Sequence, residues 1–526
     1  MEQSDLHKRL LLALVLSFIV FIGYSYFFPP QPPVNASEQA TVQSSPQTPA
    51  VQEGNALPSQ QKTAAPAPVS VSNTLATIQS DEFIITVDEY GRLAQMEMLR
   101  EKYRTKDGEN LKIISPAQVK PLEIRFSDAA IYQEATKTPY VNQSASTLDV
   151  TNGAQTLVLT QTLSSLTVTK KITFQPTGEY DIAIETSIPT PYFITPGYRP
   201  VADESMYMLV RGALIKGADD IIKTIEDGDA KDGETFKNAK IASAFDRYYA
   251  SLFFDFEKGL NVSVLKVEEG NPLLFVQPEQ NAHFHGYIGP KEYKVLYAIN
   301  PELTDAIEFG WFTFLATPFF KVLLWLNDHV GNWGWAIIIF TILIKMLLFP
   351  LSYKGMMSMQ KLKDLAPKMK ELKEKYSGDP MKMNAQMMEL YKKHGANPMG
   401  GCLPLLLQIP VFFALYRVLL NADELQGAPW ILWINDLAVM DPYYVLPILM
   451  GASMWYQQRI TPTNFTDPMQ EKIFKFFPVI MTVFFVYFPS GLVLYWLVNN
   501  LFTIVQQYYI NHAYQKHKIA ARAAHK

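Results

Sequence analysis

The feature that most constrains the fold is a set of long apolar runs. One lies near the N-terminus, where Leu10–Phe28 contains nineteen residues without a charge. Five more follow in the C-terminal part of the chain, at 333–350, 402–420, 443–458, 476–488 and 492–509. A bilayer core of about 30 Å requires runs of this kind. The sequence therefore predicts a polytopic α-helical membrane protein with six transmembrane helices, the last five forming a core.

The charges between the runs predict the orientation of these helices. Residues 351–400 contain ten lysines and five acidic residues, whereas residues 421–444 contain four acidic residues and no lysine or arginine. Loops rich in lysine and arginine remain in the cytoplasm. We therefore expect the N- and C-termini and the basic loops to be cytoplasmic, with the 421–444 loop on the opposite side.

Before the C-terminal runs, the composition divides the chain into three segments. Residues 1–28 are expected to form an uncleaved N-terminal anchor. Residues 29–75 contain nine prolines between Pro29 and Pro68 and predict a disordered linker. Residues 76–300 show period-two alternation, which predicts a large antiparallel β-sandwich on the far side of the membrane. Strands are expected at 82–88, 166–174, 180–188, 261–266 and 292–298.

The remaining segments complete the expected domain organisation. Residues 301–332 are expected to form an interfacial amphipathic helix, because Phe309–Leu326 within them mixes aromatic and aliphatic residues with Lys321. Residues 333–510 are expected to form the five-helix core, which includes a cytoplasmic helical hairpin at 351–396. Residues 511–526 form a basic cytoplasmic tail.

Lys345 is the residue that the membrane pattern does not explain, because it lies within an otherwise apolar run. One interpretation is that its long side chain reaches the lipid headgroups. The other is that it keeps a hydrated groove between the helices positively charged, because polar groups within a membrane usually face the bundle interior. Several further polar residues favour the groove: Thr341 one turn before the lysine, Gln408 in the third predicted span, and Tyr495, Asn499, Thr503 and Gln506 at intervals of 4, 4 and 3.

Short spans suggest how such a groove could work. Residues 476–488 form only thirteen positions, which is about 20 Å of helix. A short span thins the bilayer around it or buries its ends in protein. A thin membrane beside a wet, positive groove would ease the passage of a polar segment without nucleotide.

Several classes of function find no support in the sequence. The single cysteine, Cys402, excludes a disulfide framework or a thiolate metal cluster. His283 and His285 could share a strand face, but no third ligand lies nearby, so we predict no metal site. No Gly-rich phosphate loop or catalytic triad spacing stands out. We therefore predict a protein that is not an enzyme and needs no cofactor.

Four ordered motifs resemble the YidC/Oxa family of membrane protein insertases. They are Asn397-Pro-Met-Gly-Gly-Cys-Leu-Pro404, Gln408-Ile-Pro410, Thr466-Asp-Pro-Met-Gln470 and Phe488-Pro-Ser-Gly-Leu-Val-Leu-Tyr495. The segment Tyr287-Ile-Gly-Pro-Lys291, the β-rich domain and the anchor resemble the Gram-negative form.

This resemblance implies a bacterial inner-membrane insertase and intramembrane chaperone with a periplasmic β-domain. Its implied partners are nascent membrane proteins, the bilayer, the Sec translocon and the ribosome, with no direct nucleic-acid specificity. Lys345 would take the place of the family's groove arginine, and Tyr495 and Trp496 would line the groove or the surface along which substrates slide. The lysine is a departure, because it is a point charge that cannot hold a carboxylate in the bidentate manner of arginine.

Two other classes of function remain open from the residues alone. A solute transporter could use a polar groove, although it would need internal repeats or a broken-helix binding site. A membrane-anchored periplasmic binding module would explain residues 76–300 but would leave the polar stripe without a role.

Overall fold

The computed structural model describes residues 73–105, 107–200, 210–278, 282–307, 309–376, 378–396, 403–461 and 468–524. The predicted anchor 1–28, nearly all of the predicted linker 29–75 and the last two residues of the predicted tail lie outside the described residues. The chain divides into two compact units. Of the described residues, 361–396 form one unit and all others form the second.

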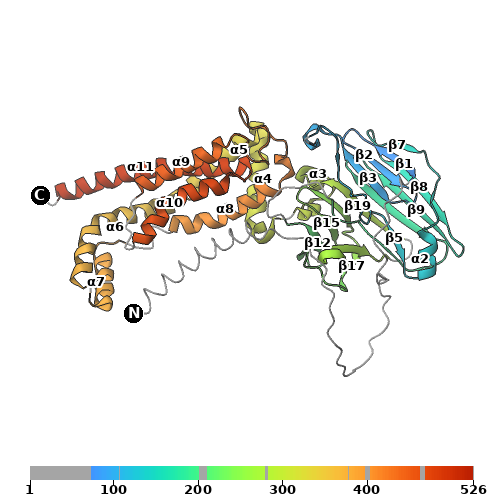
Figure 1. Cartoon of the computed structure of the whole chain (residues 1–526), viewed down its shortest axis with the longest axis horizontal. Coiled ribbons are helices and arrows are strands. Elements are labelled where there is room, and N and C mark those ends of the chain that lie inside the picture. Colours follow the sequence, from blue (N-terminus) through green and yellow to red (C-terminus); the bar gives the residue numbers. More distant parts are fainter. Residues whose placement is uncertain are drawn as a thin grey trace, which may run out of the picture. The chain divides into compact units, whose positions relative to one another are not determined.

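The N-terminal half of the described chain is a β-sandwich built from three sheets (Figure 1). The largest sheet has nine antiparallel strands, and its members in spatial order are β13 (Ile222–Glu226), β12 (Gly212–Lys216), β15 (Ile241–Phe245), β16 (Tyr249–Phe254), β19 (Ala282–Pro290), β10 (Glu179–Thr186), β9 (Thr167–Phe174), β8 (Gln155–Thr162) and β6 (Val141–Asn142). The predicted β-sandwich fold is confirmed.

Two five-stranded sheets complete this domain. The first has the order β4 (Leu111–Lys112), β3 (Leu93–Met98), β2 (Phe83–Asp88), β1 (Thr74–Gln79) and β7 (Thr147–Asp149). The second has the order β14 (Glu234–Ala239), β17 (Leu260–Lys266), β18 (Pro272–Val276), β11 (Tyr192–Ile194) and β5 (Ile124–Phe126). Strands β1 and β7 pair in parallel, and the other pairings are antiparallel.

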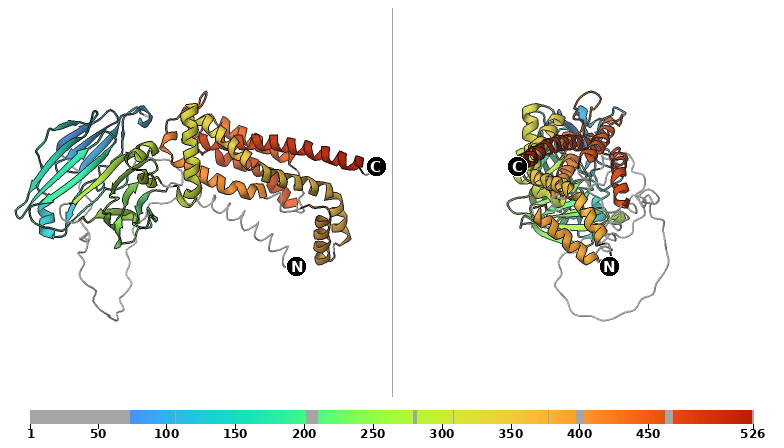
Figure 2. Two further views of the ribbon diagram at one scale, coloured as in Figure 1. Left: turned by 180° about the vertical axis from the view of Figure 1, so that it is seen from behind. Right: turned by 90° about the vertical axis from the view of Figure 1, so that its left-hand side faces the viewer.

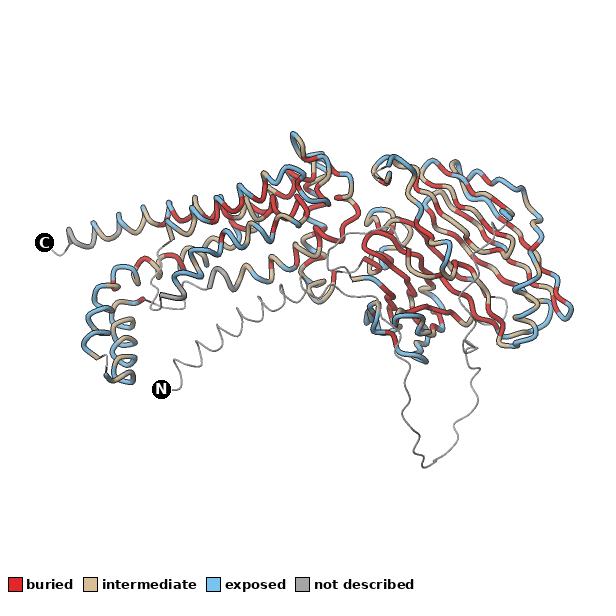
Figure 3. Tube along the Cα trace, in the orientation of Figure 1, coloured by how far each residue is buried: buried red, intermediate tan, exposed pale blue. Residues whose placement is uncertain are grey.

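Alternating burial along the strands produces the core, which Figure 3 shows as buried positions interleaved with accessible ones. On β9, Val168, Ile172 and Phe174 are fully buried, as their period-two spacing predicts. The same parity places Lys170 on the buried face, at 1% exposure. A lysine therefore lies inside the sandwich.

One predicted strand is wrong. Residues 292–298 were expected to alternate as a strand, but Tyr293–Ile299 forms the helix α3. The spacing from Tyr293 to Tyr297 also fits one helical turn, and the two rings stack with centroids 5.9 Å apart. The backbone N–H of Tyr293 donates to the Glu424 carboxylate at 2.8 Å. This side-chain partner for the first turn favours a helix over continuation of the strand.

The C-terminal part is helical. Its elements are α4 (Thr313–Val330), α5 (Trp333–Leu347), α6 (Phe349–Lys375), α7 (Pro380–Lys393), α8 (Leu403–Asn421), α9 (Val445–Ile460), α10 (Pro468–Phe485) and α11 (Ser490–Ala524). Helix α11 packs against α9 and α5, α10 packs against α9, and α4 packs against both α5 and α8 (Figure 2). The five predicted core runs correspond to α5, α8, α9, α10 and α11.

Length and composition alone identify few of these helices as membrane spans. Among the described residues, no single helix is both long and apolar enough to qualify, whereas α5 and α6, bent by 63° at their junction, qualify as a pair. Pro350 follows the bend, and proline cannot donate the backbone hydrogen bond that would continue α5 smoothly.

The unit formed by residues 361–396 contains the second half of α6 and all of α7. Lys361 Nζ donates to the Gly395 carbonyl at 3.3 Å, and the Tyr391 hydroxyl donates to Met369 Sδ at 3.8 Å. These contacts pair the two segments in antiparallel fashion. Gly395, with φ of +57°, lies two residues after the end of α7, in the left-handed conformation that is common just beyond helix C-termini.

Candidate functional site

Helix α5 carries Lys345 on its buried face. Ile337, Thr341 and Lys345 are separated by one helical turn each, and all three are buried. Only 7% of Lys345 is exposed, although it lies near the C-terminal end of the helix. The lysine therefore points into the helical bundle.

Lys345 is hydrogen-bonded to two other helices. Its Nζ donates to Gln408 Oε1 of α8 at 3.1 Å and to Thr503 Oγ1 of α11 at 2.9 Å. Among the described residues, no carboxylate lies within ion-pair distance of this ammonium. Neutral side chains therefore accept from two of its three N–H groups, and they leave its charge without a counterion.

Gln408 extends this network. Its amide nitrogen donates to the Tyr495 hydroxyl at 3.3 Å and also to Asn499 Oδ1. The Thr503 hydroxyl donates to the Asn499 carbonyl at 2.7 Å, so its oxygen remains able to accept from Lys345. The network therefore joins α5, α8 and α11, and it brings together five of the eight residues predicted from the sequence.

The other three predicted residues lie outside this network. Thr341 donates to the Ile337 carbonyl within its own helix at 2.7 Å. Trp496 packs between Phe412 and Phe485, with ring centroids 4.8 and 5.1 Å away. Gln506 is 3% exposed, and its amide nitrogen has no hydrogen-bond partner among the described residues.

A second polar stripe on α11 was not predicted from the sequence. Asn500 donates to Ser453 Oγ of α9 at 3.1 Å, and Gln507 donates to Asn511 Oδ1 at 2.7 Å. Asn511 also accepts from Gln360 of α6. Asn500, Gln507 and Asn511 are spaced by 7 and 4 residues, which is the helical spacing that identified the first stripe. The sequence therefore contained the signal for a second face.

The 421–444 loop holds a third set of buried polar groups. Asp423 Oδ2 accepts from Lys102 Nζ and from the Tyr103 hydroxyl, each at 2.8 Å. Lys102 and Tyr103 belong to a short 3₁₀ turn, η1 (Glu101–Tyr103), that follows β3. Burial raises the pKa of the Asp423 carboxyl, while Lys102 lowers it. The contact joins the loop after α8 to the β-domain.

All four acidic residues of this loop have structural partners. Glu424 accepts from the backbone of α3, and burial raises the pKa of its carboxyl to about 8. Asp436 accepts from the Ala438 N–H at 2.7 Å, and Asp441 accepts from Trp433 Nε1 at 2.9 Å. In the sequence these four acids indicate only the topology of the loop, because their partners are distant in sequence or depend on the local turns.

His283 and His285 lie side by side on β19, with ring centroids 5.6 Å apart. His285 Nδ1 is 2.5 Å from Asp181 Oδ1 on the neighbouring strand β10. Across the described part of the chain, no group of three histidine, cysteine, aspartate or glutamate side chains is arranged to hold a metal ion.

Comparison with known proteins gives two family matches. The family described as YidC periplasmic domain matches residues 75–322, and the family described as 60Kd inner membrane protein matches residues 325–518. Together these matches cover the β-domain and the helical part.

Similar full-length relatives include two proteins named membrane protein insertase YidC. The protein from Campylobacter jejuni is 49% identical over 520 residues, covering 99% of this chain and 97% of the relative. The protein from Wolinella succinogenes is 50% identical over 531 residues, covering 99% and 98%. A crystal structure described as an active YidC insertase with its first transmembrane domain resolved is 19% identical, covers 84% of this chain and 95% of that one, and has a TM-score of 0.37.

Proposed function

Because the chain belongs to the YidC family of membrane protein insertases, we propose that its Lys345 network is the site through which substrate segments enter the membrane. The protein is an inner-membrane insertase with a periplasmic domain, and its substrates are membrane proteins. The proposal concerns the route that those substrates take.

The observation that carries this proposal is a cation without a carboxylate partner among the described residues. Lys345 is held by Gln408 and Thr503, which are neutral. An acidic segment entering between α5, α8 and α11 would supply the missing negative charge. The Gln408 amide and the Thr503 hydroxyl could then form hydrogen bonds with the incoming chain instead of with Lys345, because each can donate and accept. Thr341, Trp496 and Gln506 would extend the groove along α5 and α11.

We further propose that the protein acts without nucleotide, alone or with the Sec translocon, as an intramembrane chaperone rather than an enzyme. Both termini would be cytoplasmic, with the basic tail and the hairpin facing the ribosome. The excess of lysine in residues 351–400 supports this orientation.

The direct test is insertion of a two-span substrate into liposomes that contain the purified protein, scored by protease protection. We expect Lys345→Arg to insert the substrate, and Lys345→Ala to lose insertion of acidic translocated tails. At roughly 8 Å and an effective dielectric near 20, two charges attract by about 2 kcal/mol. This predicts an insertion rate about thirtyfold lower for Lys345→Ala.

Two controls make this test specific. A substrate whose tail acids are replaced by Asn or Gln should be inserted equally by the wild type and by Lys345→Ala. Lys321→Ala removes an exposed lysine of α4 and should leave insertion unchanged. If Lys345→Ala inserts acidic and neutral tails as well as the wild type does at equal abundance, the charge has no role in the route.

A further inference from the structure

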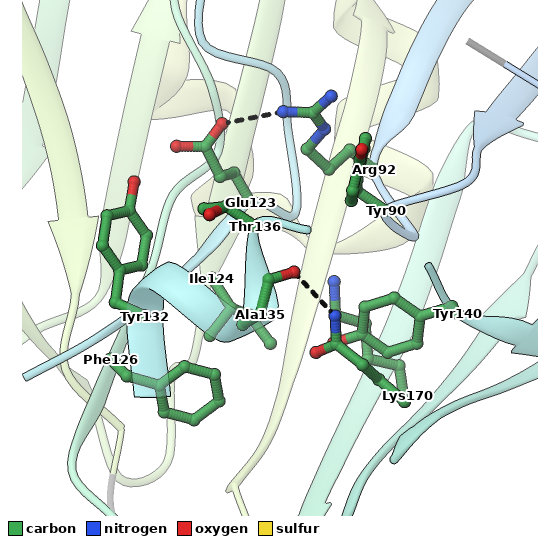
Figure 4. A pocket seen from close by; sticks show the side chains of 11 residues that line it. Tyr90, Arg92, Glu123, Ile124, Phe126, Tyr132, Ala135, Thr136, Tyr140 and Lys170 are labelled. Carbon is green, nitrogen blue, oxygen red and sulfur yellow. Dashed lines mark hydrogen bonds and ion pairs between the residues drawn. The ribbon is translucent and has the colours of Figure 1, made fainter. Parts of the chain in front are cut away.

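The β-sandwich contains a cavity whose lining includes none of the residues of the Lys345 network. Its volume is about 190 Å³, and Figure 4 shows its lining. Its lining includes the rings of Tyr90, Phe126, Tyr132 and Tyr140 and the charged side chains of Arg92 and Lys170. Aromatic rings and a few polar groups converge there, which is the general composition of a small-molecule site.

Lys170 is the polar group that distinguishes this cavity. Its Nζ donates to the carbonyls of Gly91 at 3.0 Å and Leu122 at 2.9 Å, and it lies 4.7 Å from the centre of the Tyr140 ring. An ammonium has three N–H groups, so these carbonyls leave one for a further acceptor. Figure 4 shows Lys170 beside Tyr140, on the side of the cavity away from Glu123.

The other charges around the cavity are already paired. Arg92 contacts Asp88 at 2.9 Å and Glu123 at 3.3 Å. The second oxygen of Glu123 accepts from Arg125 at 3.0 Å, and Lys120 lies 3.5 Å from Asp88. Within the described residues, Lys170 has no carboxylate at ion-pair distance. The four basic side chains here are therefore accompanied by only two carboxylates, those of Asp88 and Glu123, and the ammonium without a carboxylate is that of Lys170, which lines the cavity.

Burial of the Lys170 ammonium is energetically unfavourable without a counterion. Desolvation lowers the pKa of the Lys170 ammonium to about 7, against the opposing effect of Asp88. A buried charge is usually paired, because an uncompensated charge is strongly disfavoured in a low-dielectric interior. An anion bound in the cavity would supply that pairing.

We infer that this cavity of the β-domain binds a small carboxylate with a compact apolar body, its carboxylate on Lys170 and its body against the tyrosines and Phe126. A single negative charge fits better than a phosphate dianion, because the Arg92 guanidinium is already engaged by two carboxylates. The volume corresponds to roughly six water molecules, which suits a ligand the size of one amino acid. The carboxylate could belong to a free small molecule or to the C-terminal residue of a peptide.

The experiment measures binding of matched probes to the full chain in detergent micelles, by ligand-observed NMR titration. Phenylacetate and phenylacetamide have the same ring and differ in charge. A tripeptide ending in phenylalanine, as the free acid and as the amide, tests the peptide source. We expect each carboxylate to bind roughly tenfold or more tightly than its amide, because a charge-assisted hydrogen bond is lost. Tighter binding of phenylacetate alone would assign the site to free small molecules, and tighter binding of the peptide acid would assign it to chain ends.

Three variants test the location. Lys170→Met should abolish the preference for carboxylate over amide. Thr136→Trp places a large side chain at an exposed position of the cavity lining and should block both probes, without removing a buried group. Gln133→Trp is the matched control, because Gln133 is exposed on α2 (Ala129–Ala135), the helix that ends immediately before Thr136, but does not line the cavity.

The result that supports the inference is a carboxylate preference that is lost in Thr136→Trp and retained in Gln133→Trp. Equal affinity for acid and amide, an absence of saturable binding, or unchanged binding by Thr136→Trp would each overturn it. Lys170 would then serve only to brace the carbonyls of Gly91 and Leu122. The Thr136→Trp result decides the question even if Lys170→Met does not fold.

Discussion

Lys102 is predicted to hold the β-domain onto the loop after α8 through a buried ion pair. Its ammonium lies 2.8 Å from Asp423, which is 0% exposed and whose Oδ1 has no hydrogen-bond partner among the described residues. Lys102→Met would leave this buried carboxylate with the Tyr103 hydroxyl alone. Removing one partner of a buried pair costs about 3–5 kcal/mol. Because Lys102 is 23% exposed, we expect the lower value, about 3 kcal/mol, for opening of this contact.

The assay is thiol labelling of a cysteine introduced at Leu425, a buried position two residues after Asp423, in a background that lacks Cys402. A cost of about 3 kcal/mol corresponds to a labelling rate roughly a hundredfold higher in Lys102→Met. Asp423→Asn keeps an acceptor for Tyr103 without the unpaired charge, and adding Lys102→Met to it should change the rate much less. This non-additivity would measure the coupling of the pair.

The matched control is Lys112→Met, which removes a lysine that is 60% exposed and 3.4 Å from Glu97. Exposed pairs contribute about 0–1 kcal/mol, so labelling at residue 425 should change by no more than about fivefold. A labelling rate in Lys102→Met no higher than in Lys112→Met would refute the proposed role of the buried pair.

The remaining predictions concern helix packing, pH and topology. A Cβ at Gly451 would lie 1.8 Å from Thr482 Oγ1 and 3.1 Å from Thr482 Cβ. Gly451→Ala should therefore separate α9 from α10 and destabilise the protein by about 1–3 kcal/mol in thermal unfolding. Gly378→Ala is the control and should be neutral, because a Cβ there would have no atom within 4 Å. Burial raises the pKa of the Glu424 carboxyl from 4.5 to about 8, so the folded protein retains a proton that the unfolded chain releases. The contribution of this carboxyl to stability is therefore full below pH 4.5 and is lost as the pH rises through about 8. Thermal unfolding of Glu424→Gln should lack this decline, and a pH profile identical to that of the wild type would contradict the assignment. Cysteines at Leu432, which is 78% exposed, and at Gly378 should label from opposite sides of intact spheroplasts, and labelling from one side would overturn the proposed topology.

Periodicity explains how much of the fold could be predicted. Alternation along 166–174 and 180–188 identified strands close to β9 and β10, because a half-buried strand repeats every two residues. It failed at 292–298, where α3 begins with its first N–H bonded to Glu424, more than a hundred residues away. A short segment whose residues fit both the strand repeat and the helical repeat takes its conformation from such distant contacts. These contacts cannot be predicted from the local sequence pattern.

The sequence by itself determined the order of the β-domain and the helices, the lysine within an apolar helix and the polar stripe on α11, because each depends on spacing along one element. Only the tertiary structure decided which of those polar residues meet. It joins Lys345 to Gln408 and Thr503 but leaves Trp496 among aromatic rings. In the sequence Asp423 indicates only the negative charge of a loop, whereas in the structure it is the buried partner of Lys102. Such contacts depend on how separate elements pack in three dimensions, and the packing brings together residues separated by tens to hundreds of positions in the sequence.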